Sequence, residues 1–149
     1  MSETDAATML QKPIDPKLFS WPSSKPRLLG SRCNNCGTTS FPSQTSCPRC
    51  CSEDVASCEL GTRGKLWSYT IQGFLPKSPP YAGEETAETF RPYGVGYVEL
   101  PDQVRVVSRL KASRAEELEI GMDMELVFEP FRVDDDGAEI ISYAFRPVA

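Results

Sequence analysis

The chain has 149 residues, a formal net charge of −5 and no histidine. Its 40% hydrophobic and 25% charged residues are typical of a globular protein in water. The lack of histidine excludes Ser-His and Cys-His nucleophile pairs and histidine-ligated catalytic zinc, which leaves carboxylates, Lys, Tyr and Cys as general bases. No apolar run approaches the roughly 18 residues that span a bilayer, and the acidic N-terminus does not resemble a secretory signal. We therefore expect a cytoplasmic protein without membrane association, whose thiols stay reduced.

Residues 1–30 are expected to form an N-terminal helical segment. Asp15-Pro16 is typical of a helix start. Apolar side chains follow it: Leu18, Phe19, Trp21, Leu28 and Leu29. Two roles stay open for these side chains, because they could cover the domain that follows or lie on another protein.

Residues 31–58 contain the motif CNNCGTTSFPSQTSCPRC, in which two C-x-x-C pairs stand ten residues apart. Each C-x-x-C bends the chain so that two thiolates point at one centre, and two such knuckles complete a tetrahedron. A thioredoxin-like redox pair would need only one C-x-x-C. We predict that one zinc ion is bound by Cys33, Cys36, Cys47 and Cys50. Iron is the alternative metal, since a four-thiolate site accepts either.

The predicted zinc is structural. Four thiolates close the coordination shell and leave no position for water, and the metal staples a segment that is too short to build a core of its own. In CPRCC either Cys50 or Cys51 could be the ligand, and the repeated x-x spacing favours Cys50. Cys58 is interpreted as a small buried apolar residue.

Residues 59–149 show the alternation of five β-strands. The strands are expected at 65–71, 93–100, 103–110, 124–131 and 140–145. Hairpin turns are predicted at Pro101-Asp102 and at VDDDG, with a short helical or turn segment at 112–121 between the hairpins. Gly94 and Gly96 indicate a bulge, a bend or the close approach of another backbone. Five bent strands with a long excursion after the first suit an OB-like barrel.

That excursion, residues 72–92, holds four prolines and three aromatic residues. Loops longer than about 12–15 residues are uncommon in compact domains unless they are functional or disordered. Two interpretations stay open: a flexible linker, or a loop that docks on a ligand or partner. Lys77 and Arg91 are the only cations of this loop.

The ribbon motif, the strand LGTRGKLWSYTI and the hairpin PYGVGYVEL–VRVVSRL together resemble the zinc-ribbon/OB-fold proteins that accompany thiolase-like enzymes. Examples are the small subunit of benzoylsuccinyl-CoA thiolase and the OB-fold partner domains of steroid side-chain aldolases. The resemblance covers the chain from about residue 15 onward. It implies a mainly β fold in which an N-terminal helix and a rubredoxin-like zinc ribbon precede a five-stranded OB-fold barrel.

The resemblance also implies a function. The chain would be an accessory subunit without catalytic residues of its own, which stabilises a thiolase-fold large subunit and helps it bind acyl-CoA for thiolytic or retro-aldol C–C cleavage. Zinc would be its structural cofactor, and coenzyme A or acyl-CoA a ligand shared by the complex. Near the CoA entrance, Lys77 or Arg91 could pair with a phosphate, and Phe74 or Tyr93 could line the adenine or pantetheine path. The glutamates of residues 84–88 are a departure, since CoA is anionic.

Two other functions stay open. An OB-fold can bind single-stranded nucleic acid through aromatic side chains and a basic groove. The aromatic side chains would be Trp67, Tyr69, Tyr97 and Phe128. However, residues 59–149 carry ten basic and sixteen acidic residues, so we expect no nucleic-acid binding. The chain could also be a free-standing acyl-CoA binding protein or enzyme, and an adjacent thiolase-like gene would distinguish these functions.

Overall fold

The fold is described by a computed structural model for residues 10–101 and 104–148. These residues form nine strands and one short 3₁₀ helix. The strands are β1 (Gln11–Pro13), β2 (Leu29–Cys33), β3 (Thr39–Ser40), β4 (Val55–Glu59), β5 (Arg63–Gln72), β6 (Tyr93–Glu99), β7 (Arg105–Leu110), β8 (Asp123–Val133) and β9 (Glu139–Pro147), and the helix is η1 (Ala115–Glu117). No helix in this part of the chain is long and apolar enough to cross a membrane.

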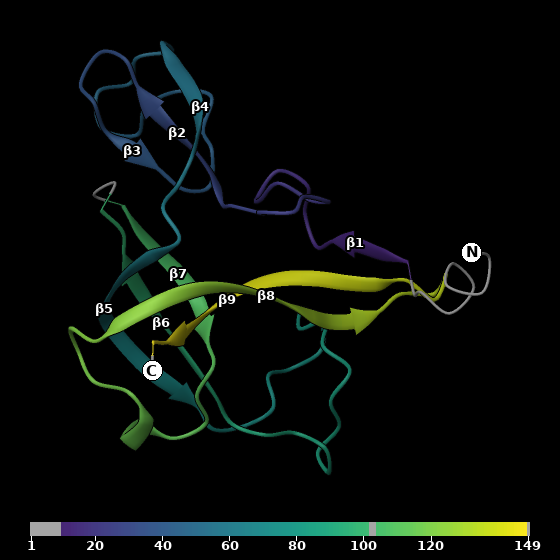
Figure 1. The fold of residues 1–149 in the computed structure, drawn as a ribbon. Helices are drawn as coiled ribbons and strands as arrows, with labels where there is room; N and C mark the ends of the chain where they lie inside the picture. The colour runs from purple at the N-terminus through teal and green to yellow at the C-terminus, as the bar shows by residue number, and fades with distance from the viewer. Residues whose placement is uncertain (1–9, 102–103, 149) are drawn as a thin grey trace.

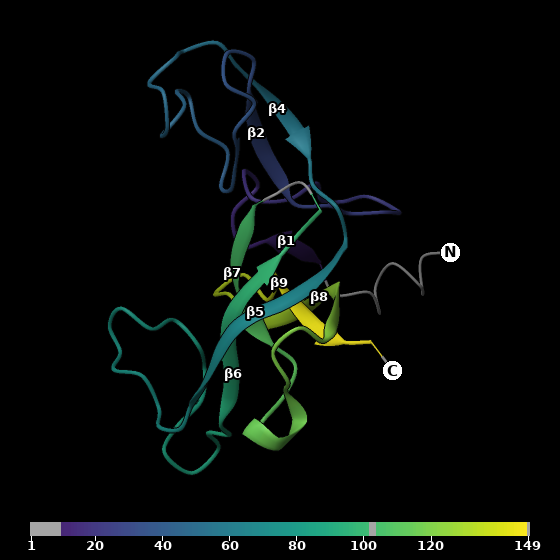
Figure 2. The ribbon, with the colours of Figure 1, turned by 90° about the vertical axis from the view of Figure 1, so that its left-hand side faces the viewer.

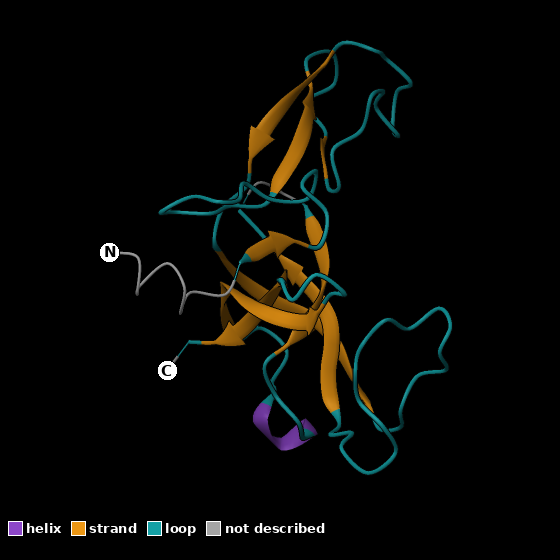
Figure 3. Ribbon diagram, turned by 90° about the vertical axis from the view of Figure 1, so that its right-hand side faces the viewer, coloured by secondary structure: helices purple, strands orange, loops and turns teal. Residues whose placement is uncertain are grey.

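Strands β5 to β9 close into a barrel, as Figure 3 shows. The sheet runs in the order β1-β9-β7-β6-β5-β8, and β8 also pairs with β9, which closes strands β5 to β9 and leaves β1 as an edge strand beside β9. The barrel pairs are antiparallel except β7 and β9, which run parallel. A five-stranded barrel of this kind is an OB-fold, so the fold predicted for this region is confirmed.

The barrel core follows from the alternation of its strands, because successive side chains point to opposite faces. Val98 and Val106 are fully buried, whereas their neighbours Tyr97 and Val107 are exposed. Further buried side chains complete the core: Leu66, Leu100, Leu110, Met124, Ile141 and Phe145. A side chain at Gly96 would run into the carbonyl oxygen of Ser68. The predicted close approach of another backbone is therefore confirmed, while the shift in register lies in β5, between Leu66 and Ser68.

The predicted N-terminal helix is wrong for the described residues of this segment, and residues 1–9 lie outside them. Strand β1 pairs with β9 in parallel, and a β-bridge joins Phe19 to Leu28. After Asp15 the chain makes one turn, closed by the hydrogen bond from Leu18 N to the Asp15 carbonyl. The helix does not continue because Pro22 and Pro26 follow closely and lack the N–H that a helix needs.

The apolar residues of this segment cover the barrel. Phe19 and Leu28 are fully buried and belong to the core cluster, and Leu18 and Trp21 pack against it. The ring centroid of Phe19 lies 4.8 Å from that of Phe128. Two roles were predicted for these side chains. The structure supports the first, in which they cover the barrel of the same chain.

The ribbon is a three-stranded antiparallel sheet in the order β3-β2-β4. It stands at one end of the barrel, and the loop between β5 and β6 extends from the opposite end (Figures 1 and 2). The chain enters the ribbon after Leu28 and leaves it at Leu60, and these two residues are joined by a hydrogen bond of 2.9 Å from Leu60 N to the Leu28 carbonyl. Arg27 Nε donates to the Leu60 carbonyl at 2.8 Å and fastens the same junction.

Candidate metal centre and ligand surfaces

Four cysteine sulfurs converge at the end of the ribbon that lies away from the barrel core. Cys33 ends β2, Cys36 lies in the turn after it, and Cys47 and Cys50 lie between β3 and β4. All four Sγ atoms lie within 4.8 Å of one another, and the Cys33–Cys50 and Cys36–Cys47 pairs are each 3.6 Å apart. A tetrahedron with metal–sulfur bonds of about 2.3 Å has sulfur–sulfur edges of about 3.8 Å. The cage therefore fits a four-coordinate ion such as zinc.

Backbone amides point at the first sulfur of each C-x-x-C pair. Asn35 N and Cys36 N lie 3.3 and 3.4 Å from Cys33 Sγ. In the second pair, Arg49 N and Cys50 N lie 3.3 and 3.5 Å from Cys47 Sγ. At Cys33 the backbone hydrogen bond from Cys36 lowers the pKa of the thiol, but burial and the contacts with the Cys50 and Cys36 side chains outweigh it, so the pKa is raised.

Side chains favour the thiolate at the two other sulfurs. Thr38 Oγ1 lies 3.1 Å from Cys36 Sγ. This contact and a backbone hydrogen bond at Thr38 lower the pKa of Cys36 to about 6. Asn35 Nδ2 lies 3.4 Å from Cys50 Sγ, and with a backbone hydrogen bond at Ser52 it lowers the pKa of Cys50. A metal bound by four sulfur ligands has no open position for substrate, which is typical of a structural site.

Cys51 occupies the place in the second knuckle that Gly37 has in the first. Gly37 N donates to the Cys33 carbonyl and Cys51 N to the Cys47 carbonyl, both at 2.9 Å. Both residues have a positive φ, 82° at Gly37 and 67° at Cys51. Cys51 is exposed and is not one of the four converging sulfurs, so the geometry selects Cys50 from the ambiguous CPRCC. Cys58 packs against the barrel core but is only half-buried, so the predicted burial is met in part.

The loop 72–92 is fastened to the barrel by Tyr81. Its hydroxyl accepts a hydrogen bond from Arg109 Nη2 at 3.0 Å and donates one to Glu85 Oε1 at 2.9 Å. Its ring lies edge-on to Phe131 in β8, with centroids 5.9 Å apart. The backbone N–H of Val133 donates to Glu84 Oε2 at 3.0 Å. The interpretation as a flexible linker is therefore wrong at this part of the loop, which docks on its own barrel.

Arg109 organises this attachment, and the sequence did not single it out. Its guanidinium lies 3.7 Å above the ring centroid of Tyr93 and 5.7 Å from that of Phe131. Burial alone would lower the pKa of Arg109, but the hydrogen bond with Tyr81 raises it, so the charge is retained. Burial is in turn the main cause that raises the pKa of Tyr81. The only sequence signal was an arginine on the outward face of a strand with apolar neighbours.

The four residues predicted to contact CoA do not form one compact cluster. Phe74 is 73% exposed, Lys77 and Arg91 are exposed, and Tyr93 is half-buried beneath Arg109. No hydrogen bond, ion pair or ring contact links any two of them within the described ranges. The ring of Phe90 lies beside that of Tyr93, with centroids 6.1 Å apart.

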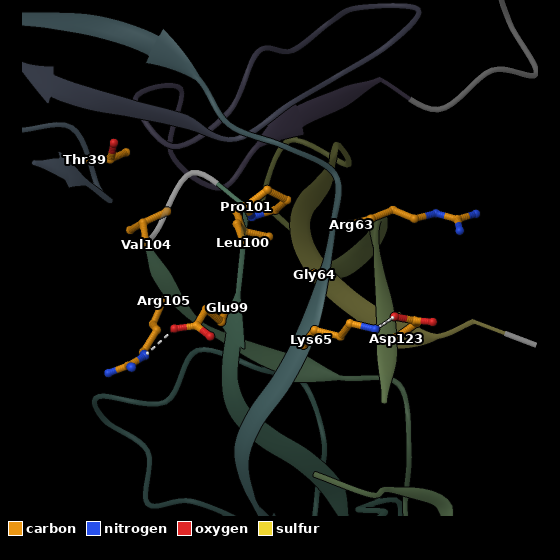
Figure 4. A pocket seen from close by; sticks show the side chains of 10 residues that line it. All are labelled: Thr39, Arg63, Gly64, Lys65, Glu99, Leu100, Pro101, Val104, Arg105 and Asp123. Carbon is orange, nitrogen blue, oxygen red and sulfur yellow. Dashed lines mark hydrogen bonds and ion pairs between the residues drawn. The ribbon is translucent and has the colours of Figure 1, made fainter. Parts of the chain in front are cut away.

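A cavity of about 940 Å³ lies between the ribbon and the barrel (Figure 4). It is lined by Thr39, Arg63, Gly64, Lys65, Glu99, Leu100, Pro101, Val104, Arg105 and Asp123. A second cavity, of about 430 Å³, shares Thr39 and Pro101 with it and extends beside the metal ligand Cys36. We call the larger cavity the junction groove. Sequence reasoning missed it, because its lining comes from five separate segments.

Two family profiles match the chain. The profile described as "ChsH2, rubredoxin-like zinc ribbon domain" matches residues 24–56, and "ChsH2, C-terminal OB-fold domain" matches residues 58–129. A DUF35 domain-containing scaffold protein of Methanocaldococcus jannaschii is 33% identical over 87% of this chain and 89% of that protein. The chain belongs to the DUF35 family. The predicted resemblance to zinc-ribbon/OB-fold proteins is thereby confirmed.

Other relatives carry the names of a thiolase subunit and an aldolase. Benzoylsuccinyl-CoA thiolase subunit BbsA of Thauera aromatica is 32% identical over 83% of this chain and 78% of that subunit. Among solved structures, a chain of the Ltp2-ChsH2(DUF35) aldolase matches with a TM-score of 0.60 and 30% identity, covering 83% of this chain and 86% of its own. A DUF35 protein from Sulfolobus solfataricus, with a TM-score of 0.50, 14% identity and coverage of 82% and 74%, shares the fold alone.

Proposed function

We propose that this chain is the accessory subunit of a thiolase-like complex that processes acyl-CoA by thiolytic or retro-aldol C–C cleavage. The observation that carries the proposal is the 32% identity to the thiolase subunit BbsA across 83% of the chain. The likeness to the DUF35 component of the Ltp2-ChsH2 aldolase, across the same share of the chain, supports it independently. The thiolase-fold large subunit would carry the catalytic residues, and this chain would stabilise it.

The metal centre fits an accessory role. Cys33, Cys36, Cys47 and Cys50 would hold one structural zinc ion, whose four sulfur ligands leave no position for substrate. The ribbon consists of three short strands, in which β2 pairs with β3 and with β4, and it has little hydrophobic core of its own. Metal binding would therefore supply its folding free energy. The chain also has no histidine, which removes the commonest general acid–base group.

The loop 72–92 would help the large subunit to bind acyl-CoA. Lys77 and Arg91 are its cations and are exposed, so each can reach a phosphate of the ligand. Phe74 is exposed and could lie along the adenine or pantetheine. Tyr93 would contribute through the parts of its ring that Arg109 does not cover. Attachment through Tyr81 and Glu84 would hold these side chains in place before the ligand arrives.

The test is to express the thiolase-fold protein that co-purifies with this chain, with and without it, and to measure cleavage of its acyl-CoA. We expect the pair to form a permanent complex and the large subunit alone to be inactive or unstable. Full activity of the large subunit alone would refute the accessory function. A KM for acyl-CoA that is unchanged in Lys77→Ala and Arg91→Ala would refute the role of the loop while leaving the complex intact.

A further inference from the structure

The outer face of the barrel beside the junction groove carries three large exposed apolar side chains. Trp67 is 45%, Tyr97 42% and Val107 51% exposed. They come from the adjacent strands β5, β6 and β7, whose outer sides face the viewer in Figure 2. We call these three residues the outer apolar face. Aromatic residues of this kind are enriched where proteins bind one another.

The register of the strands places the three side chains together. Tyr97 and Val107 are directly paired Cα partners. Trp67 sits at the register shift of β5, next to Ser68, which pairs with Tyr97. The Trp67 and Tyr97 ring centroids lie 5.9 Å apart in an edge-on arrangement. The shift adds Trp67 as an extra outward residue, and such irregularities often mark functional positions in a sheet.

Arg105 connects this face to the junction groove. Its guanidinium lies 3.9 Å from the Trp67 ring centroid, and the same side chain lines the groove. Beyond it the groove continues over the apolar residues Leu100, Pro101 and Val104 (Figure 4). The outer apolar face and the groove therefore form one continuous surface, which runs from the barrel strands to the ribbon.

Each cation that lines the groove has a carboxylate neighbour within the chain, although Glu125 beside Arg63 also pairs with Arg146. Lys65 pairs with Asp123 at 2.5 Å and Arg105 with Glu99 at 3.1 Å. The remaining cation of the groove, Arg63, lies 3.7 Å from Glu125. An anionic ligand would have to compete with these carboxylates. The charge balance thus fits an uncharged, apolar occupant better than a phosphate chain.

We propose that the outer apolar face and the junction groove receive an uncharged apolar segment of the large subunit, with Trp67 as the central contact. This rests on the proposed accessory function and assigns its interface. The Trp67 ring contacts the partner, while the Arg105 guanidinium stacks on this ring and lines the neighbouring groove. Centrally placed Trp residues of this kind carry much of the energy of protein interfaces.

The experiment uses the complex of this chain with its co-purifying thiolase-fold partner. In a Trp21→Phe background, Trp67 is the only tryptophan, so a fluorotryptophan label reports on it alone by ¹⁹F NMR. We expect the Trp67 resonance to shift and lose solvent exposure when unlabelled partner is added.

Val107→Arg should weaken the complex at least about thirty-fold. Ile14→Arg is the matched control, because it also places a charge at an exposed β-branched residue, beside β1, and should change the affinity less than about twofold.

Unchanged metal content and far-UV circular dichroism establish that the variants are folded. A complex that forms with full affinity in Val107→Arg and leaves the Trp67 resonance unmoved would overturn this interface but leave the accessory function standing. Failure of the unmodified chain to associate with any thiolase-fold protein would overturn both. A Trp67 shift produced by oligothymidylate, or by 3′-phosphoadenosine 5′-diphosphate, without the partner would overturn the apolar occupant and identify an anionic one.

Discussion

Replacing Arg109 with Met should release the loop 72–92 from the barrel. The guanidinium provides a hydrogen bond to Tyr81 and a stacking contact with Tyr93. A hydrogen bond to a charged group contributes about 1.5–3 kcal/mol, and a cation–π contact about 0.5–2 kcal/mol. Because Met retains part of the apolar packing and the released loop regains conformational entropy, we expect a net loss of about 2 kcal/mol of loop attachment. That loss corresponds to a roughly thirty-fold larger open population.

Limited trypsin digestion measures this opening, because Lys77 lies within the attached loop. When opening and closing are fast relative to cleavage, the rate follows the open population. Cleavage after Lys77 should therefore be roughly thirty-fold faster in Arg109→Met. Tyr81→Phe, which removes only the hydroxyl, should give a smaller increase. The double variant should be less than additive, since both changes remove the same hydrogen bond.

The matched control is Arg105→Met. Arg105 lies four residues earlier on the same face of β7, but it contacts Trp67 and Glu99 and not the loop. Its replacement should leave cleavage after Lys77 unchanged. Equal cleavage rates in the unmodified chain and Arg109→Met would refute the attachment, and so would an equally large effect of Arg105→Met.

Elemental analysis should find one zinc per chain, which is lost in Cys50→Ser together with the ribbon fold and kept in Cys51→Ser; loss in Cys51→Ser instead would refute the assignment of ligands. Cys51→Gly should raise the free energy of unfolding by about 0.5–1 kcal/mol, because glycine accommodates the positive φ at that position, and a lower thermal midpoint would contradict this. Phe19→Ala should reduce the free energy of unfolding by about 3–5 kcal/mol, since it empties a fully buried site against Phe128; a denaturant titration that shows less than 1 kcal/mol, about the effect of a surface substitution, would place Phe19 outside the core. Electrophoretic shift assays at about 150 mM salt should show no complex with single-stranded DNA or RNA, and tight binding that weakens steeply with salt would refute the expectation drawn from the charge.

The sequence predicted the features that depend on local patterns. The alternation of KLWSYTI indicates β5, and the repeated C-x-x-C spacing identifies the sulfurs that converge. Both signals lie within a few residues, so they do not depend on the rest of the fold. Asp15-Pro16 is a local signal too and starts one turn, but Pro22 and Pro26 follow closely and prevent the turn from extending into a helix.

The attachment of the loop and the junction groove could not be predicted in this way. Arg109 and Tyr81 stand 28 residues apart, and the residues of the groove reach from Thr39 to Asp123. Their proximity exists only once the barrel has closed. For the same reason, the four aromatic residues considered under the nucleic-acid alternative are divided by the fold. Trp67 and Tyr97 remain exposed, whereas Tyr69 and Phe128 pack against the core.

The hydrogen bond between Leu60 N and the Leu28 carbonyl places the two ends of the ribbon segment side by side. The chain leaves the barrel and returns to it at neighbouring points, so residues 29–59 could be replaced by a two-residue hairpin turn without stretching the backbone. Barrel folding would then not require metal, and chelation would melt one end of the molecule while the other keeps its core. In the cell, a shortage of zinc would leave the barrel folded but deprive the junction groove of its ribbon wall at Thr39. Metal supply would thereby determine how much of the chain's surface is assembled for a partner.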